Sequence, residues 1–282
     1  MKTIEPHALY AGAPKFGIAG TMAGHREQAG EAGDFTQVSA APGQPKGMFP
    51  YHIPGHASFL GVDPVSSDRL VLPAGDDAGR VQAEPEVGLV VALDWADGQI
   101  AAVRPLGFTA YNDASVRRPA PKISRKKNWG PHTKGLAAEV VPLDDLSAGG
   151  ILDRYHLMSF LLRDGVLHDY GEDCAVRTYA CFHDALLTWI AGRLNEQVDQ
   201  GPLEHLAPML VGHPTRAVIG IGATRYAALP VSDRLQPGDE IIIVVYDRSR
   251  FDSVQLRQAI EHRDPLPPGN PVLRQRVEAA AP

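Results

Sequence analysis

Two glutamates separated by one proline stand at the start of an apolar stretch. Glu84-Pro85-Glu86 leads into the run 87–93, whose Val, Leu and Ala residues are typical of a buried strand. Side chains two residues apart in an extended chain project from the same face, so both carboxylates can converge on one point. Such a pair repels itself unless a hard cation such as Mg2+, Mn2+ or Ca2+ lies between the oxygens. The spacing therefore allows a metal site, although two solvated glutamates are the commoner interpretation of Glu-x-Glu alone.

The residues around this pair are predicted to form a β-hairpin. The segments 87–93 and 101–103 have the character of buried strands, and Asp97-Gly98 between them favours a tight turn. Pro85 fits the entry of a strand, because it cannot donate a hydrogen bond to the ladder. The first strand of the hairpin therefore begins at the two glutamates.

Three further elements are predicted from periodicity and turn residues. A helix is expected at 182–195, where Leu and Ile recur at helical spacing, and a shorter one at 143–147. Pro237-Gly238 predicts a turn into the run 240–246, whose β-branched residues are typical of a central strand. The Pro- and Gly-rich region 41–78 is interpreted as an irregular connection across the surface.

The composition is that of an ordinary globular protein. Its 282 residues are 44% hydrophobic and 21% charged, and no apolar run approaches the roughly 18 residues of a membrane helix. Met1 to Tyr10 lacks the apolar core of a secretory signal, so we expect a cytoplasmic protein without a membrane partner. Cys174 and Cys181 lack both a disulfide framework and Cys-x-x-Cys spacing, and we expect two reduced thiols.

A short basic segment departs from this composition. Although the formal net charge is -6, six basic residues crowd into it: Arg117, Arg118, Lys122, Arg125, Lys126 and Lys127. The segment is either a solvated loop or the mouth of a site that receives a small anionic substrate. The net negative charge and the lack of a phosphate-binding glycine motif argue against nucleic-acid and nucleotide partners.

A second motif follows the hairpin after a short interval. The run Gly107-Phe108-Thr109-Ala110-Tyr111-Asn112-Asp113-Ala114-Ser115-Val116-Arg117, downstream of Glu84-Pro85-Glu86, resembles the core of the fumarylacetoacetate hydrolase family. The resemblance implies that Glu84, Glu86 and Asp113 bind one divalent cation, Mg2+ or alternatively Mn2+ or Ca2+. It also implies that Arg117 lies near the substrate.

Two segments resemble parts of the family's catalytic machinery. Trp129-Gly130-Pro131-His132-Thr133-Lys134-Gly135 is similar to a family tract that ends in a lysine beside the metal, which implies this role for Lys134. The Gly-rich stretch from Phe16 to Gln28 is similar to the family lid, in which a His and a Glu orient a water. His25 matches, and its acid would be Glu27 or Glu31, because Gln28 occupies the usual position of the carboxylate.

The segment 218–226 is similar to the family's substrate loop, and implies substrate contacts at Ala223 and Thr224. The Pro-Gly-Asp turn at 237–239 follows it, as in the family. The hydroxyl residues of the loop are displaced, since Ala223 stands where a second Thr is usual. The contacts to a substrate carboxylate must therefore differ from those of the family.

The resemblance implies a mixed α/β, predominantly β fold, a β-roll with short flanking helices and a lid segment. The expected parts are an N-terminal segment with the lid and a connection (1–78), a fumarylacetoacetate hydrolase-like catalytic core (79–250) and a peripheral C-terminal tail (251–282). The family commonly forms homodimers, so a homodimer is expected.

The activity implied is that of a divalent-metal-dependent hydrolase. It would cleave a carbon-carbon bond in a 1,3-dicarbonyl or 2-oxo acid that chelates the metal through two oxygens. An oxo-acid decarboxylase or tautomerase is the alternative if the His25 dyad is incomplete, because neither reaction needs a nucleophilic water. A non-catalytic protein that binds a metal and a small ligand is the alternative from another class.

Overall fold

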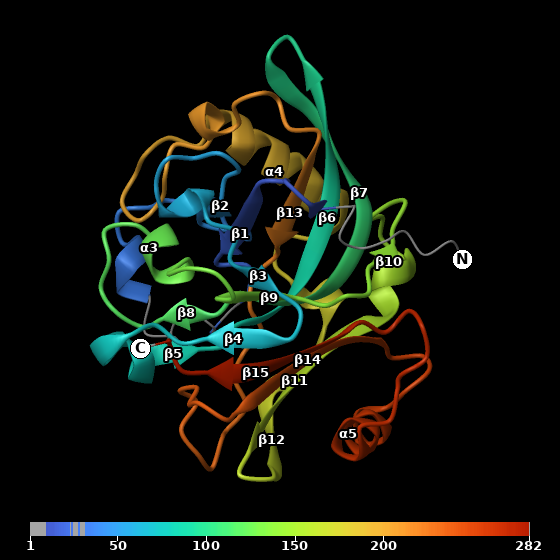
Figure 1. The fold of residues 1–282 in the computed structure, drawn as a ribbon. Coiled ribbons are helices and arrows are strands. Elements are labelled where there is room, and N and C mark those ends of the chain that lie inside the picture. Colours follow the sequence, from blue (N-terminus) through green and yellow to red (C-terminus); the bar gives the residue numbers. More distant parts are fainter. Residues whose placement is uncertain (1–9, 23, 25–27, 29–31, 282) are drawn as a thin grey trace.

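The computed structural model describes residues 10–22, 24, 28 and 32–281. The regular structure of the chain is mostly β-strand, in two large sheets, with few helices (Figure 1). The fold is therefore mixed but predominantly β, as expected. None of the described helices is both long and apolar enough to cross a bilayer.

The larger sheet carries the residues of the predicted metal site. Its strands run in the order β2-β1-β13-β6-β7-β9-β3, and β10 pairs with β7. The bounds are β1 Lys15–Ala19, β2 Gly47–His52, β3 Val65–Ser66, β6 Pro85–Ala96, β7 Gln99–Asn112, β9 Lys134–Leu136, β10 Val141–Pro142 and β13 Arg216–Gly220. β2 lies in the region expected to be irregular, but all six of its residues are buried.

The second sheet has five strands in the order β12-β11-β14-β15-β4. Their bounds are β4 Arg69–Val71, β11 Tyr155–Arg163, β12 Val166–Ala175, β14 Glu240–Asp247 and β15 Val272–Glu278. The two short strands β5 Val81–Gln82 and β8 Ser115–Val116 pair separately. The α-helices are α3 Ser124–Lys127, α4 His183–Glu196 and α5 Ser253–His262, and 3-10 turns occur at Ala32–Phe35, Phe59–Gly61, Gly75–Arg80, Ile151–Arg154, Val176–Thr178 and Ala207–Met209.

The predicted hairpin is confirmed as β6 and β7. Ala96 pairs with Gln99 across the turn, and Asp97 and Gly98 have φ angles of 51° and 76°. Two successive positive φ angles are what a two-residue hairpin turn requires, and Asp-Gly tolerates them. All of the first nine residues of β6 are buried.

The helix predicted at 182–195 is confirmed as α4, which packs on β7 with Leu186, Ile190 and Leu194 buried. The central strand predicted at 240–246 is β14, which lies between β11 and β15. The helix predicted at 143–147 is wrong. The Leu143 N–H donates to the Leu106 carbonyl, which continues the pairing of β10 with β7, and the Asp145 side chain accepts from the Ser147 N–H in a local turn.

The segment 251–282, expected as a peripheral tail, contributes an inner strand to the second sheet. β15 runs antiparallel to β14 and parallel to β4, and buries Leu273 and Val277. α5 lies outside this sheet, at the lower right of Figure 1. β15 also reaches the larger sheet, because the Gln275 amide donates to the Lys134 carbonyl at 3.1 Å.

Candidate metal centre and active site

Three buried carboxylates meet at the open end of the β6–β7 hairpin. Glu84 precedes β6, Glu86 is the second residue of that strand, and Asp113 follows β7. The Asp113 N–H donates to the Glu84 carbonyl at 2.9 Å, so the hairpin register sets the two residues side by side. One oxygen from each carboxylate lies within 4.8 Å of the others. Oxygens on opposite sides of Mg2+, Mn2+ or Ca2+ are about 4 to 5 Å apart, so this donor set fits such an ion.

Asn112 explains why an Asn-Asp pair suits this position. Its side-chain oxygen accepts from the Glu84 N–H at 3.1 Å, and its amide nitrogen donates to Gln275 at 2.9 Å. Gln275 belongs to β15, and therefore the second sheet helps to fix the end of the hairpin. Asn112 is fully buried, so each of these bonds satisfies a polar group that water does not reach.

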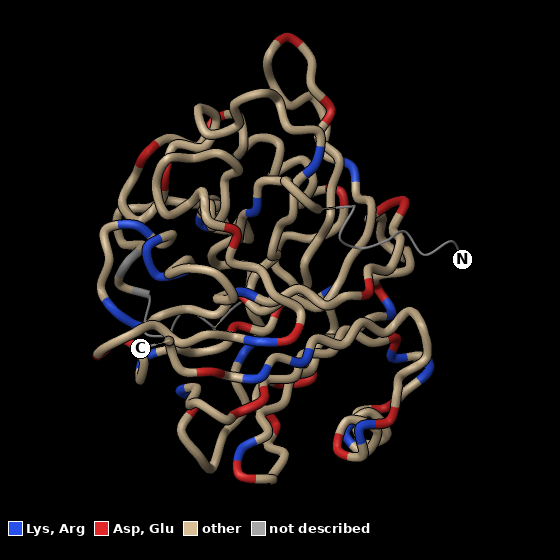
Figure 2. The backbone as a smooth tube through the Cα atoms, viewed as in Figure 1, with Lys and Arg blue, Asp and Glu red and all other residues tan. Residues whose placement is uncertain are grey.

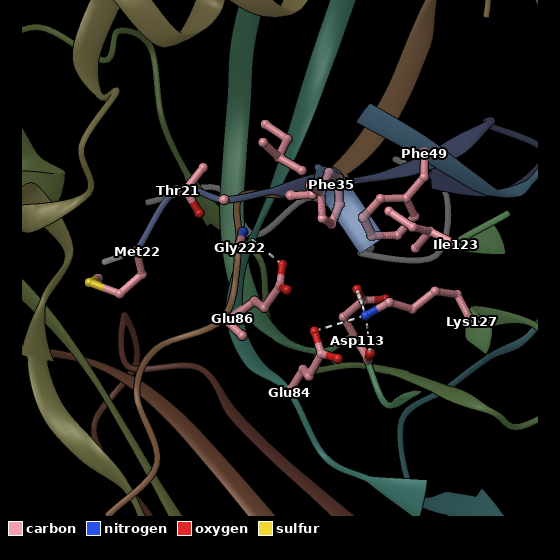
Figure 3. Close-up of a pocket in the computed structure, with 14 residues that line it drawn as sticks. Thr21, Met22, Phe35, Phe49, Glu84, Glu86, Asp113, Ile123, Lys127 and Gly222 are labelled. Atoms are coloured by element: carbon pink, nitrogen blue, oxygen red, sulfur yellow. Dashed lines mark hydrogen bonds and ion pairs between the residues drawn. The ribbon is translucent and has the colours of Figure 1, made fainter. Parts of the chain in front are cut away.

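Lys127, the last residue of α3, joins two of the carboxylates (Figure 3). Its Nζ lies 2.8 Å from Glu84 Oε2 and 2.6 Å from Asp113 Oδ2, and it also donates to the Asp113 carbonyl at 3.2 Å. The side chain is only 3% exposed. A buried lysine is stabilised in its charged form only by such neighbours. Lys127 is therefore a fixed positive charge beside the candidate metal ligands.

Asp113 receives a second cation on its other oxygen. Lys134 Nζ lies 2.9 Å from Asp113 Oδ1, and Tyr111 donates to the same oxygen at 3.0 Å. Lys134 also donates to the Ala114 carbonyl. Burial lowers the pKa of Lys134 to about 8, and the charge of Asp113 opposes that shift. Lys134 lies behind Asp113, and is absent from the described residues that line the pocket.

Arg117 holds Glu84 from the side away from Lys127. Its NH2 nitrogen lies 2.9 Å from Glu84 Oε1 and donates to the Tyr226 hydroxyl at 2.9 Å. Its Nε donates to Gln82 at 2.6 Å. Tyr226 in turn donates to the Ala83 carbonyl at 2.9 Å. Glu84 is therefore oriented between two cations, Arg117 and Lys127.

Glu86 differs from the other two carboxylates, because no described residue forms an ion pair with it. Its Oε2 accepts from the Gly222 N–H at 2.9 Å. Burial, followed by the charges of Asp113 and Glu84, holds the pKa of Glu86 well above its usual range; Lys127 and the Gly222 N–H act in the opposite direction. A divalent cation would neutralise the charged form of Glu86, which burial and the neighbouring carboxylates disfavour. This imbalance of charge is the observation that favours a metal here.

The carboxylates form the polar end of a pocket with an empty volume of about 430 Å3. The walls come from β1 and the residues after it, from Phe49 of β2, from the start of α3 and from the loop after β13. The described lining residues are Ile18, Ala19, Gly20, Thr21, Met22, Phe35, Phe49, Glu84, Glu86, Asp113, Ile123, Lys127, Gly222 and Ala223.

The predicted substrate loop lies against Glu86, one of the three carboxylates. Ala223 lines the pocket, and Thr224 is buried beside it with its N–H donating to the Pro85 carbonyl at 3.2 Å. Gly222 precedes them with a φ angle of 107°, where a side chain would overlap Thr21 Oγ1. The loop can therefore approach Glu86 closely only with glycine at this position.

The predicted lid dyad falls on His25, Glu27 and Glu31, which lie outside the described residues. Gln28 is described, and its side chain is bound to the substrate loop. Gln28 Oε1 accepts from the Tyr226 N–H at 3.0 Å, and Gln28 Nε2 donates to the Tyr226 carbonyl at 3.3 Å. The residue at the position where the family usually has the acid partner of the histidine thus makes a paired contact with the backbone of Tyr226.

Some residues of the basic segment point toward the carboxylates and others lie on the outer surface, so it is both the edge of a site and a solvated loop. Figure 2 shows its Lys and Arg residues around α3, which Figure 1 labels. Arg117 and Lys127 turn inward to the carboxylates. Lys122 pairs with Asp199 at 2.7 Å on the outside, and the Arg125 guanidinium lies 4.3 Å from the centre of the Phe59 ring.

The sequence motifs assign the role of the lysine beside the metal to Lys134 and do not single out Lys127 as a site residue. Lys127 is one of six basic residues in a short run, and nothing local distinguishes it from Lys126. The available signal was distance along the chain: Lys127 is 14 residues after Asp113, in a segment already interpreted as the mouth of an anion site. Only the direction of α3 decides which lysine enters.

Comparison with known protein families identifies the family of this chain. Residues 31–277 match a family of unknown function, DUF5718. No curated protein sequence matches the chain.

Solved structures share the fold at low sequence identity. A 5-carboxymethyl-2-hydroxymuconate delta-isomerase from Mycobacterium smegmatis is 16% identical with a TM-score of 0.56, covering 96% of this chain and 80% of that chain. A 2-keto-3-deoxyarabinonate dehydratase is 12% identical with a TM-score of 0.54, covering 96% and 75%. A protein described as a fumarylacetoacetate hydrolase family member from Yersinia pestis is 13% identical with a TM-score of 0.51, covering 94% and 93%. The chain belongs to the family of unknown function DUF5718, and its fold is that of solved structures of the fumarylacetoacetate hydrolase family.

Proposed function

We propose that this chain is a divalent-metal-dependent enzyme that stabilises the enolate of a small 2-oxo acid or 1,3-dicarbonyl compound. The observation that carries the proposal is the convergence of Glu84, Glu86 and Asp113 within 4.8 Å at the polar end of an enclosed pocket. The solved structures of similar fold support it, because their names include an isomerase and a dehydratase of oxo or hydroxy acids.

The donor set suits Mg2+, Mn2+ or Ca2+, since all three ligands offer carboxylate oxygens. When bound, such an ion would supply Lewis-acid stabilisation of the negative charge that develops on two substrate oxygens. Lys127 adds a preorganised positive charge at the same end of the pocket. Its Nζ is held by Glu84 and Asp113 at 2.8 and 2.6 Å, so it needs no rearrangement when charge develops nearby.

The remaining contacts orient the ligands. Arg117 holds Glu84, Lys134 and Tyr111 hold Asp113, and the Gly222 N–H holds Glu86. Partners of this kind fix the direction of a metal-binding oxygen and are normally needed for full metal affinity. We expect Lys134 to act through Asp113, because the pocket is lined by Lys127 instead.

Among the reactions that form an enolate, Gln28 favours tautomerisation or decarboxylation over carbon-carbon hydrolysis. Hydrolysis needs a base that activates water, and His25 with a carboxylate would be that base. Gln28 stands at the usual position of the acid, carries no charge, and binds the backbone of Tyr226 with both ends of its amide. Hydrolysis would therefore depend on Glu27 or Glu31.

The enolate is common to the three reactions: tautomerisation forms it by loss of a proton next to the ketone to a base, decarboxylation by loss of carbon dioxide, and hydrolysis by transfer of an acyl group to water. Formation of the enolate by proton loss is the step to test first. Exchange of the protons next to the ketone of 2-oxobutyrate with D2O can be followed by proton NMR with each of the three metals. Oxaloacetate and acylpyruvates, followed in parallel, report decarboxylation and hydrolysis. Loss of hydrolysis in His25→Ala with exchange retained would identify a hydrolase that uses the lid.

Glu86→Gln is the sharpest variant. It removes a carboxylate that forms no ion pair with any described residue, and a glutamine oxygen can still accept from the Gly222 N–H. We expect this variant to fold at least as well as the wild type without metal, but to lose metal binding and exchange. Asp145→Asn, on an exposed turn, is the matched control. Full exchange in Glu86→Gln would refute the metal-dependent proposal, as would tight metal binding without any reaction.

The expected homodimer remains part of the proposal. Light scattering during size-exclusion chromatography would give its mass, and a monomer of 30.3 kDa would contradict it.

A further inference from the structure

An apolar wall adjoins the polar end of the pocket. Ile18, Phe35, Phe49 and Ile123 line the pocket and are each between 2% and 4% exposed. Figure 3 shows Phe35, Phe49 and Ile123 together above Lys127, while Glu84, Glu86 and Asp113 lie below. The pocket therefore has two ends of different chemistry.

The two ends are in direct contact. Lys127 Nζ lies 5.3 Å from the centre of the Phe49 ring, and Phe49 belongs to the same apolar cluster as Phe35 and Ile123. A ligand whose oxygens reach the carboxylate end would therefore place its next carbon atoms against this wall.

The wall is held in place from behind. A side-chain carbon at Gly17 would overlap the Phe49 ring, so β1 lets the ring lie directly on its backbone. Val38 and Leu203 complete the cluster away from the pocket. An apolar surface that cannot withdraw gains free energy when an apolar group covers it, whereas a carboxylate placed there would lose its hydration without a hydrogen-bond partner from these side chains.

We propose that the substrate is a monocarboxylic oxo acid with a short alkyl or aryl tail, and that the tail lies against Phe35, Phe49 and Ile123. This inference rests on the oxo-acid function proposed above and specifies its substrate class. The tail is short, because the whole pocket, with its carboxylate end, has an empty volume of about 430 Å3. A dicarboxylic acid of the same length would place its second carboxylate on the apolar wall.

Two ligands of equal length test the proposal on the wild-type protein. 2-Oxohexanoate ends in a methyl group where 2-oxoadipate ends in a carboxylate. Their binding to the Mg2+-loaded or Mn2+-loaded protein is measured by calorimetry, which needs no turnover. We expect 2-oxohexanoate to bind at least about tenfold more tightly. Along the series pyruvate, 2-oxobutyrate, 2-oxovalerate and 2-oxohexanoate, affinity should rise about fourfold per methylene until the wall is covered.

A variant pair locates the tail. Ile123→Ala should weaken 2-oxohexanoate binding by about tenfold and leave pyruvate binding unchanged, because pyruvate has no tail to reach the wall. Leu203→Ala truncates the same cluster outside the pocket, and should leave the ratio of the two affinities unchanged. If Ile123→Ala does not fold, Ile123→Val removes one carbon and should lower the ratio about threefold.

The outcomes separate this inference from the proposed function. Equal or tighter binding of 2-oxoadipate overturns the apolar-tail proposal but leaves an oxo-acid enzyme standing, and so does an affinity that does not change with tail length. Failure of every 2-oxo acid to bind the metal-loaded protein overturns both.

Discussion

Lys127→Met tests whether Lys127 and a metal ion neutralise the same carboxylates. The substitution keeps the length and apolar stem of the side chain but removes the ammonium that lies 2.8 Å from Glu84 Oε2 and 2.6 Å from Asp113 Oδ2. Both pairs are almost entirely shielded from water, and removing one partner of a buried pair costs about 3–5 kcal/mol. We expect the free energy of unfolding of the metal-free protein to fall by that amount.

The response to metal should change in the opposite direction. A unit charge about 4 Å away contributes about 4 kcal/mol at an effective dielectric constant of 20, so removing the ammonium favours a cation at the carboxylates. Mg2+ should therefore stabilise Lys127→Met more than it stabilises the wild type. The variant should nevertheless lose most of its activity, because the fixed positive charge in the pocket is gone.

Urea unfolding in EDTA and in excess Mg2+ measures both effects. Lys122→Met is the matched control, because Lys122 Nζ pairs with Asp199 at 2.7 Å on a partly exposed surface. This substitution should lower the free energy of unfolding by about 1 kcal/mol or less and should not change the response to metal. Two results would refute the claim that Lys127 and a metal ion neutralise the same carboxylates. One is a free energy of unfolding of metal-free Lys127→Met within about 1 kcal/mol of the wild-type value, and the other is equal stabilisation of both proteins by Mg2+.

Three further substitutions test neighbouring features. Thr21 has a buried hydroxyl without a hydrogen-bond partner among the described residues, so Thr21→Val should raise the free energy of unfolding by about 1 kcal/mol; a loss in urea unfolding would contradict this. Gly222→Ala should destabilise the protein by about 2 kcal/mol or more, because of its φ angle of 107° and the overlap with Thr21; Thr21→Ala in the same chain should recover part of the loss, and simple additivity would contradict the overlap. Burial raises the pKa of Glu204 to about 7 from an ordinary value of 4.5, against the Ser124 hydrogen bond. The folded protein then binds the proton more tightly than the unfolded chain, so stability should fall by about 3 kcal/mol as the pH rises between those values. Unfolding at several pH values should show that this decline is absent in Glu204→Gln, and an unchanged decline would rule out Glu204 as its source.

Local features of the sequence predicted several parts of the molecule correctly. Asp97-Gly98 predicted the hairpin because few dipeptides accept two positive φ angles, and the recurrence of Leu186, Ile190 and Leu194 predicted α4. The helix at 143–147 failed for a related reason. Its few apolar residues gave too little pattern, and the backbone after Pro142 instead pairs with β7.

In the candidate site, too, some features follow from the local sequence and others only from the tertiary structure. Glu84 and Glu86 project together because alternate residues of a strand share a face, and that follows from the chain alone. Asp113 joins them through the register of β6 with β7, which shifts between Val90 and Val91 and between Asp94 and Trp95, so the turn at Asp97-Gly98 does not set it alone. Lys127, Gly222 and the apolar wall come from separate segments, and nothing local to those segments fixes their distance from the carboxylates.

The sequence by itself determined the β6–β7 hairpin, α4 and the types of donor, because turn geometry, helical spacing and strand alternation act over a few residues. Tertiary structure decided which lysine enters the pocket, which carboxylate lacks a cation, and where the apolar wall lies. These choices depend on the direction of α3 and on the packing of β1, β2 and β13 beside β6. They are set by contacts between residues far apart in the chain, whose energies no local pattern contains.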